Sequence, residues 1–213
     1  MCFSATASFT AGTILVASGA YIYKKAKNKK TKPFASIPFL FGLQQLIEGV
    51  VWLSLNNAWP IVNVFSTYGF VFFSNLLWPI YIPFAVAKIE TNSWRKKAII
   101  ACGAVGVVVS FYSLASIIVH PIQSQVNCNS IHYLFTTLLP LPTAINTLFY
   151  FVATCLSCLL SQHKLIKIFG ITVVTSLILT YLFFTVTLVS VWCFFSAILS
   201  LVIYFIVKQL NKN

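Results

Sequence analysis

The chain has 213 residues, of which 59% are hydrophobic and 8% are charged, whereas a soluble domain carries about 25% charged residues. This composition excludes a soluble globular fold and predicts an all-α, polytopic membrane protein. The net charge of +12 would suit nucleic acid, but the bases fall in short clusters between apolar runs, so no nucleic-acid partner is expected.

Seven apolar stretches are long enough to cross the hydrocarbon core, which takes about 20 helical residues. In chain order they are 4–23, 34–56, 61–87, 98–119, 141–161, 169–187 and 189–207. No charge or proline separates the last two. A single helix over 169–207 would nevertheless be about 58 Å long, far more than the membrane core, so we expect a tight hairpin near 185–190. These spans predict one transmembrane domain over residues 1–213.

The basic residues predict how the spans are oriented. With the N-terminus outside, the cytoplasmic segments are 24–33, 88–97, 162–168 and 208–213, and they hold all fourteen bases of the chain. The positive-inside rule favours this arrangement, which places the C-terminus in the cytoplasm. Besides the lipid bilayer itself, the expected partners are anionic headgroups at these basic segments.

Two kinds of residue predict how the helices pack. Small residues at four-residue spacing, such as Ser8 and Gly12 in the first span and Gly106 in the fourth, allow helix backbones to approach closely. Pro79 and Pro83 lie inside the third span. Proline within a helix kinks it and frees carbonyl groups, and such kinks often line cavities.

Glu48 is one of only two acidic residues, and it lies inside the second span. Counted from Phe34, it is about 21 Å along the helix, in the predicted outer half of the membrane. No lysine or arginine lies within a span. The carboxyl is therefore protonated, faces a water-filled cavity, or meets a cation or a histidine. An ionisable residue at this depth marks a functional site by default; the alternative is a protonated glutamate that links two helices.

Other polar side chains are expected beside Glu48. Helical spacing places Gln44 or Gln45 and Trp52 on its face, while the external loop 120–140 and the start of the last span contribute further groups. The predicted pocket consists of Gln44, Gln45, Glu48, Trp52, His132, Tyr133 and Cys193.

The same region holds the candidates for catalysis and metal binding. Glu48 would act as acid or base, with Cys2 or Cys193 as nucleophile. Histidine and cysteine also bind zinc or copper, and the residues that could do so are His120, His132, Cys2 and Cys128. Their spacing matches no metal motif, so we assign no metal site and no cofactor. Cys128 could pair with Cys2 or Cys193 in an oxidising compartment.

Several stretches of the chain resemble one family. MCFSATASF (1–9), FGLQQLIEGVVW (41–52) and SVWCFFSA (190–197) are similar to an uncharacterised family of small bacterial seven-helix membrane proteins. Its members open with MCFSA-x-ASF and carry a Q-x-x-E-G-x-x-W-like stretch, and the match runs along the whole chain. The resemblance implies a multi-pass protein of the bacterial inner (plasma) membrane. It implies no reaction, ligand or catalytic residue.

Three functions remain open at this stage. The first is transport of a small molecule or ion, or ligand sensing, through an outward-facing pocket around Glu48. The second is a membrane enzyme acting at the outer leaflet, with Glu48 as acid or base. The third is a structural or accessory subunit. A retinal protein is excluded because every lysine lies outside the spans, and a ceramidase-type zinc hydrolase is excluded because the chain has no aspartate.

Overall fold

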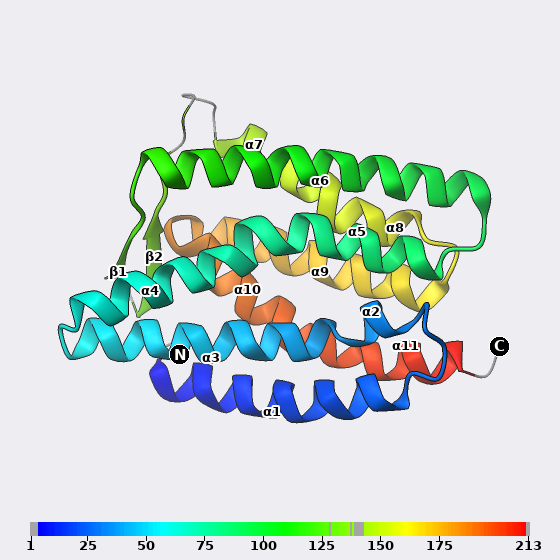
Figure 1. The fold of residues 1–213 in the computed structure, drawn as a ribbon, viewed down its shortest axis with the longest axis horizontal. Coiled ribbons are helices and arrows are strands. Elements are labelled where there is room, and N and C mark those ends of the chain that lie inside the picture. Colours follow the sequence, from blue (N-terminus) through cyan, green and yellow to red (C-terminus); the bar gives the residue numbers. More distant parts are fainter. Residues whose placement is uncertain (1–3, 128, 137, 139–142, 212–213) are drawn as a thin grey trace.

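The computed structural model describes residues 4–127, 129–136, 138 and 143–211, which form a bundle of near-parallel helices (Figure 1). The elements are α1 (Ala5–Lys25), α2 (Lys32–Ala35), α3 (Ile37–Asn56), α4 (Pro60–Val71), the π-helical turn η1 (Phe72–Leu77), α5 (Trp78–Ile89), α6 (Ser93–Val119), the strands β1 (Gln123–Asn127) and β2 (Ser130–Leu134), α7 (Thr143–Phe151), the π-helical turn η2 (Val152–Leu156), α8 (Ser157–Leu160), α9 (Lys164–Phe183), the 3₁₀ turn η3 (Thr185–Thr187), α10 (Leu188–Leu199), the 3₁₀ turn η4 (Ser200–Val202) and α11 (Ile203–Leu210).

The helices are apolar enough to cross a membrane. Over the described residues, six helical stretches have the required length and composition: Ala5–Lys25, Lys32–Asn56, Pro60–Ile89, Ser93–Val119, Lys164–Phe183 and Thr185–Leu210. A shorter apolar helix, Ile145–Leu160, corresponds to the fifth predicted span. The chain is therefore a multi-pass helical membrane protein, as predicted.

The structure differs from the sequence prediction in two details of its elements. The helices extend over basic residues that were expected in connections, since α6 begins at Ser93 and α9 at Lys164. Lysine and arginine are good helix formers and their long side chains can reach the membrane interface. In addition, the expected loop 120–140 contains an antiparallel hairpin, in which Gln123 pairs with Leu134 and Asn127 with Ser130.

The two ends of the bundle differ in charge. The connections α1–α2, α5–α6 and α8–α9 and the end of α11 lie at the same end (Figure 1). Each described basic residue lies in one of these connections or in the helical turn beside it. We call this end the basic end, and the opposite end, which carries β1 and β2, the hairpin end.

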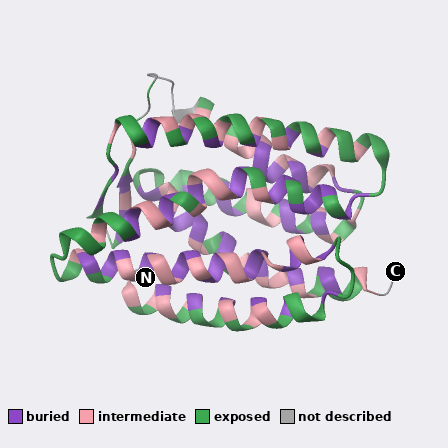
Figure 2. Cartoon of the chain, in the orientation of Figure 1, coloured by how far each residue is buried: buried purple, intermediate pink, exposed green. Residues whose placement is uncertain are grey.

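The helix α3 lies at the centre of the packing. It is largely buried, whereas α1 and α6 carry exposed residues along their outer faces (Figure 2). The predicted small-residue face of α1 is confirmed, because Ser8 and Gly12 are buried. A Cβ atom on Gly12 would lie 2.9 Å from the backbone nitrogen of Leu46 in α3. This close approach of α1 leaves no space for a side chain there.

A proline of the third span frees a carbonyl group that another helix binds. In η1 the N–H of Trp78 bonds to the carbonyl of Phe73, five residues back. The next residue, Pro79, has no N–H to offer Ser74 in that pattern. The hydroxyl of Tyr150 donates to the Ser74 carbonyl instead, at 2.6 Å. The carbonyl that Pro79 leaves free therefore accepts a hydrogen bond that links the third span to α7.

The second acidic residue, Glu90, closes the basic end. It is 3% exposed, and its carboxylate accepts hydrogen bonds from the Asn92 backbone N–H at 3.1 Å, the Ser161 hydroxyl at 3.2 Å and the Gln162 backbone N–H at 2.8 Å. Arg95 donates to the carbonyl of Leu160 at 2.9 Å. Hydrogen bonds thus link the α5–α6 connection to the α8–α9 connection, and the contacts of the Glu90 carboxylate are structural.

Candidate functional site

Glu48 lies inside the bundle, where α3 faces α10. Its side chain is 2% exposed. The hydroxyl of Ser190, in the first turn of α10, donates to Oε1 of Glu48 at 2.5 Å. Ser190 was not among the predicted pocket residues, although it lies one helical turn before Cys193 and so shares its face of the helix. Because the contact joins residues 142 apart in the chain, helical spacing within α3 could not reveal it.

Unpaired polar groups surround this carboxyl. Gln44, Gln45 and Trp52 occupy the neighbouring turns of α3 and are buried. Gln44 Nε2, both side-chain polar atoms of Gln45, Trp52 Nε1 and the hydroxyl of Tyr133 are buried without a hydrogen-bond partner among the described residues. We call Gln44, Gln45, Glu48, Trp52 and Tyr133 the Glu48 cluster. All members except Tyr133 lie on neighbouring turns of α3.

Tyr133 enters the cluster from β2. Its ring stacks on Phe70 of α4, with centroids 4.5 Å apart and planes at 3°, and it packs in one group with Trp52 and Cys193. Burial raises the pKa of the Tyr133 phenol well above its usual range, and the nearby Glu48 carboxyl and Cys193 thiol add to the rise. The phenol therefore stays neutral at physiological pH and offers both a donor and an acceptor.

The hairpin lies across the helix ends at one end of the bundle (Figure 1), and its residue Tyr133 packs with Trp52 of the Glu48 cluster. Ser124 of β1 holds it in place, because its hydroxyl lies 2.9 Å from Asn63 Nδ2 and 2.8 Å from the hydroxyl of Thr67, both in α4. Asn63 also donates to Ser54 of α3 at 3.1 Å. A polar network on α3 and α4 thus anchors the strand that pairs with the Tyr133 strand.

The substitution Ser124→Ala should loosen the hairpin. Removing the shared hydroxyl should cost about 1–2 kcal/mol of hydrogen-bond energy between the hairpin and α4. The measurement is the rate at which N-ethylmaleimide labels Cys193 in a protein that keeps only that cysteine. We expect Ser124→Ala to raise this rate by about fivefold to tenfold. Gln125→Ala is the matched control, because Gln125 is exposed on the other face of the same strand. Equal labelling rates in the two variants would show that the hairpin does not limit access.

Among the remaining predicted residues, His132 does not face the Glu48 cluster. His132 is on the opposite face of β2 from Tyr133, since side chains alternate along a strand, and its Nδ1 lies 3.5 Å from Nε2 of Gln125. His120 caps the end of α6. Cys2 and Cys128 lie outside the described residues. Within the part of the chain that the structure describes, no group of three or more histidine, cysteine or acidic residues could hold a metal ion.

Cys193 is the predicted residue that links the cluster to the interior of the bundle. Its thiol is buried and free. It packs with Trp52 and Tyr133 on one side and lines a cavity with Trp78 on the other. Trp78 itself donates from Nε1 to Oε1 of Gln44 at 2.7 Å. Trp78 was not among the predicted pocket residues, because its link to Gln44 depends on how α5 packs against α3.

A comparison with known protein families identifies the family to which the chain belongs. Residues 1–213 match the family described as a family of unknown function, DUF6629. The chain belongs to DUF6629. Comparisons with curated proteins and with solved structures found no significant match. For this DUF6629 chain, the evidence on function is therefore the geometry of its own site.

Proposed function

We propose that this protein binds a small molecule or an ion at the Glu48 cluster and serves as a transporter or a ligand sensor. One observation carries the proposal: the side chains around the Glu48 carboxyl keep polar atoms without a partner among the described residues. Each buried unpaired polar group costs about 1–3 kcal/mol, and native proteins carry few of them. A ligand or water that completes these hydrogen bonds would remove that cost.

The chemistry of the cluster supports a binding role. Glu48 offers a carboxyl that can hold a proton or face a cationic group, and its partner in the structure is a neutral hydroxyl from Ser190. Gln45 offers an amide whose donor and acceptor are both free of partners within the described residues. Trp52 adds a single donor. Such a set can surround a polar group from several sides.

Charge supports an orientation for the proposed site. The positive-inside rule would place the basic end in the cytoplasm. In the bacterial inner membrane, which the sequence resemblance implies, the hairpin end would then face outward. A ligand would reach the Glu48 cluster past β1 and β2. The hairpin would be the part that moves during entry.

Glu48→Gln tests the proposal. The purified protein in detergent micelles is titrated calorimetrically with amines, amino acids, carboxylates, sugars and metal cations, and bound compounds are then tested for uptake into liposomes. We expect at least one class to bind the natural protein and to bind Glu48→Gln at least about tenfold more weakly, a difference of about 1.4 kcal/mol.

Glu90→Gln is the control, because it alters the only other acidic residue of the chain, which lies in the α5–α6 connection at the basic end. It should leave the affinity unchanged. If Glu48→Gln folds normally and binds every compound as the natural protein does, the Glu48 cluster is not the site.

A further inference from the structure

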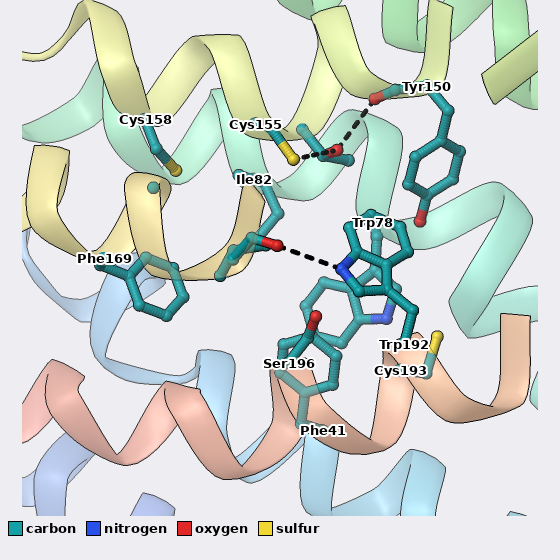
Figure 3. Close-up of a pocket in the computed structure, with 13 residues that line it drawn as sticks. Phe41, Trp78, Ile82, Tyr150, Cys155, Cys158, Phe169, Trp192, Cys193 and Ser196 are labelled. Carbon is teal, nitrogen blue, oxygen red and sulfur yellow. Dashed lines mark hydrogen bonds between the residues drawn. The ribbon is translucent and has the colours of Figure 1, made fainter. Parts of the chain in front are cut away.

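The interior of the bundle contains a cavity of about 40 Å³ next to the Glu48 cluster. Five aromatic residues from different helices form much of its wall: Phe41, Trp78, Tyr150, Phe169 and Trp192 (Figure 3). Its volume corresponds to about three water molecules, but its walls are almost wholly apolar. Apolar cavities of this kind do not hold water well. The small volume and the aromatic lining therefore suit a compact group that binds to aromatic rings.

The rings are held in place by hydrogen bonds at their polar edges. Trp78 donates to Gln44 at 2.7 Å and Trp192 donates to the Val173 carbonyl at 3.3 Å, while the Tyr150 hydroxyl is bound to Ser74. The polar atoms of all three rings are thus used within the protein. What remains for a bound group is the aromatic carbon surface.

The rings also pack closely against one another. Phe41 stacks on Trp78 with centroids 4.0 Å apart. Tyr150 meets Trp192 edge to face, with centroids 5.6 Å apart and planes at 70°. These contacts join α3 to α5 and α7 to α10. The aromatic wall is therefore built from two ordered pairs.

Two π-helical turns flank the cavity. The turn η1 ends directly before Trp78, and η2 contributes Thr154 and Cys155 to the lining. Single π-helical turns occur frequently at functional sites. The hydroxyl of Ser196 lies among the lining residues, is buried, and has no hydrogen-bond partner in the described part of the chain. Both features point to a binding site rather than a packing defect.

The helix α3 and Cys193 connect this aromatic wall to Glu48. Gln44, one helical turn from Glu48, bonds to Trp78 of the wall, and Cys193 belongs to both the wall and the group around Trp52. Aromatic faces attract cations, by about 2 kcal/mol or more when water is excluded. A cation held by these rings would have the Glu48 carboxylate as its counter-ion, and no lysine or arginine is among the buried residues of the described chain.

We propose that the cavity binds the ammonium head of a small organic cation, with the aromatic rings around the cation and Glu48 as its counter-ion. The inference rests on the proposed function and names its ligand class. The small volume selects a compact ammonium group. The hydroxyl of Ser196 would bind a polar substituent of the ligand.

The test compares charged and neutral ligands of one shape. Methylammonium, tetramethylammonium and choline chlorides are titrated into the purified full-length protein by calorimetry, with potassium chloride as the salt control. The neutral isostere of choline, 3,3-dimethylbutan-1-ol, is titrated in parallel. We expect at least one of the cations to bind. If choline binds, its neutral isostere should bind at least about tenfold more weakly, because it lacks the cation–π contribution.

Variants separate this inference from the proposed function. Glu48→Gln and Trp192→Leu should each weaken the cation at least tenfold, whereas Trp94→Leu, which alters an exposed tryptophan at the basic end, should not. Unfolding temperatures confirm that each variant folds. Absence of binding by all three cations, or equal binding of choline and its neutral isostere, overturns the inference. The proposed function would still stand if another compound class required Glu48, and it would fail if none did.

Discussion

Replacing Gly106 by alanine is expected to lower the free energy of unfolding by about 3 kcal/mol, at the upper end of the usual cost of overpacking. A Cβ atom on Gly106 would lie 2.7 Å from the carbonyl carbon of Pro79 and closer still to its oxygen. That carbonyl is the one that Pro83, which has no N–H, leaves unpaired in α5. The backbone of α6 can approach it only because residue 106 has no side chain.

The measurement is thermal unfolding of the purified protein in micelles. For a chain of this size, a loss of 3 kcal/mol corresponds to about 6–12 °C. Gly103→Ala is the matched control on the same face of α6, because its Cβ would lie 3.6 Å from the side chain of Pro83, an ordinary contact. It should change stability by less than about 1 kcal/mol. Equal unfolding temperatures for the two variants would refute the close approach.

Glu48→Met is expected to stabilise the protein by about 1–2 kcal/mol and to abolish ligand binding. Replacing a buried charged or polar residue by an apolar one of similar length is often stabilising, and functional sites commonly sacrifice stability. The hydrogen bond from Ser190 is lost, but a serine hydroxyl in a helix can turn to a carbonyl of the preceding turn. Unfolding temperature and calorimetric affinity together check the two effects.

Replacing the other acidic residue, Glu90, by methionine should lower the stability of the protein. Glu90→Met would leave the Gln162 backbone N–H and the Ser161 hydroxyl without their acceptor. Each unpaired buried group costs about 1–3 kcal/mol, so we expect a clear loss of stability. If Glu48→Met destabilised the protein as strongly as Glu90→Met, Glu48 would be a structural link between α3 and α10, and the functional reading would fail.

Within the candidate site, the part that lies on one helix was predictable. Gln44, Gln45, Glu48 and Trp52 share neighbouring turns of α3, and the helical period places them together wherever α3 lies. Tyr133 was included in the predicted pocket because of its expected depth, and the structure brings it to the cluster on one face of β2. His132 is directed away for the same reason, because adjacent residues of a strand point to opposite faces.

The sequence by itself determined the helical membrane architecture and the common end of the basic residues. Both follow from local properties, namely the length of apolar runs and the positions of charges, which act on each segment separately. Only the tertiary structure decided that Ser190 pairs with Glu48, that Glu90 closes the basic end, and that aromatic rings from several helices enclose one cavity. These contacts join residues far apart in the chain, and they depend on which helix faces pack together, which no single segment encodes.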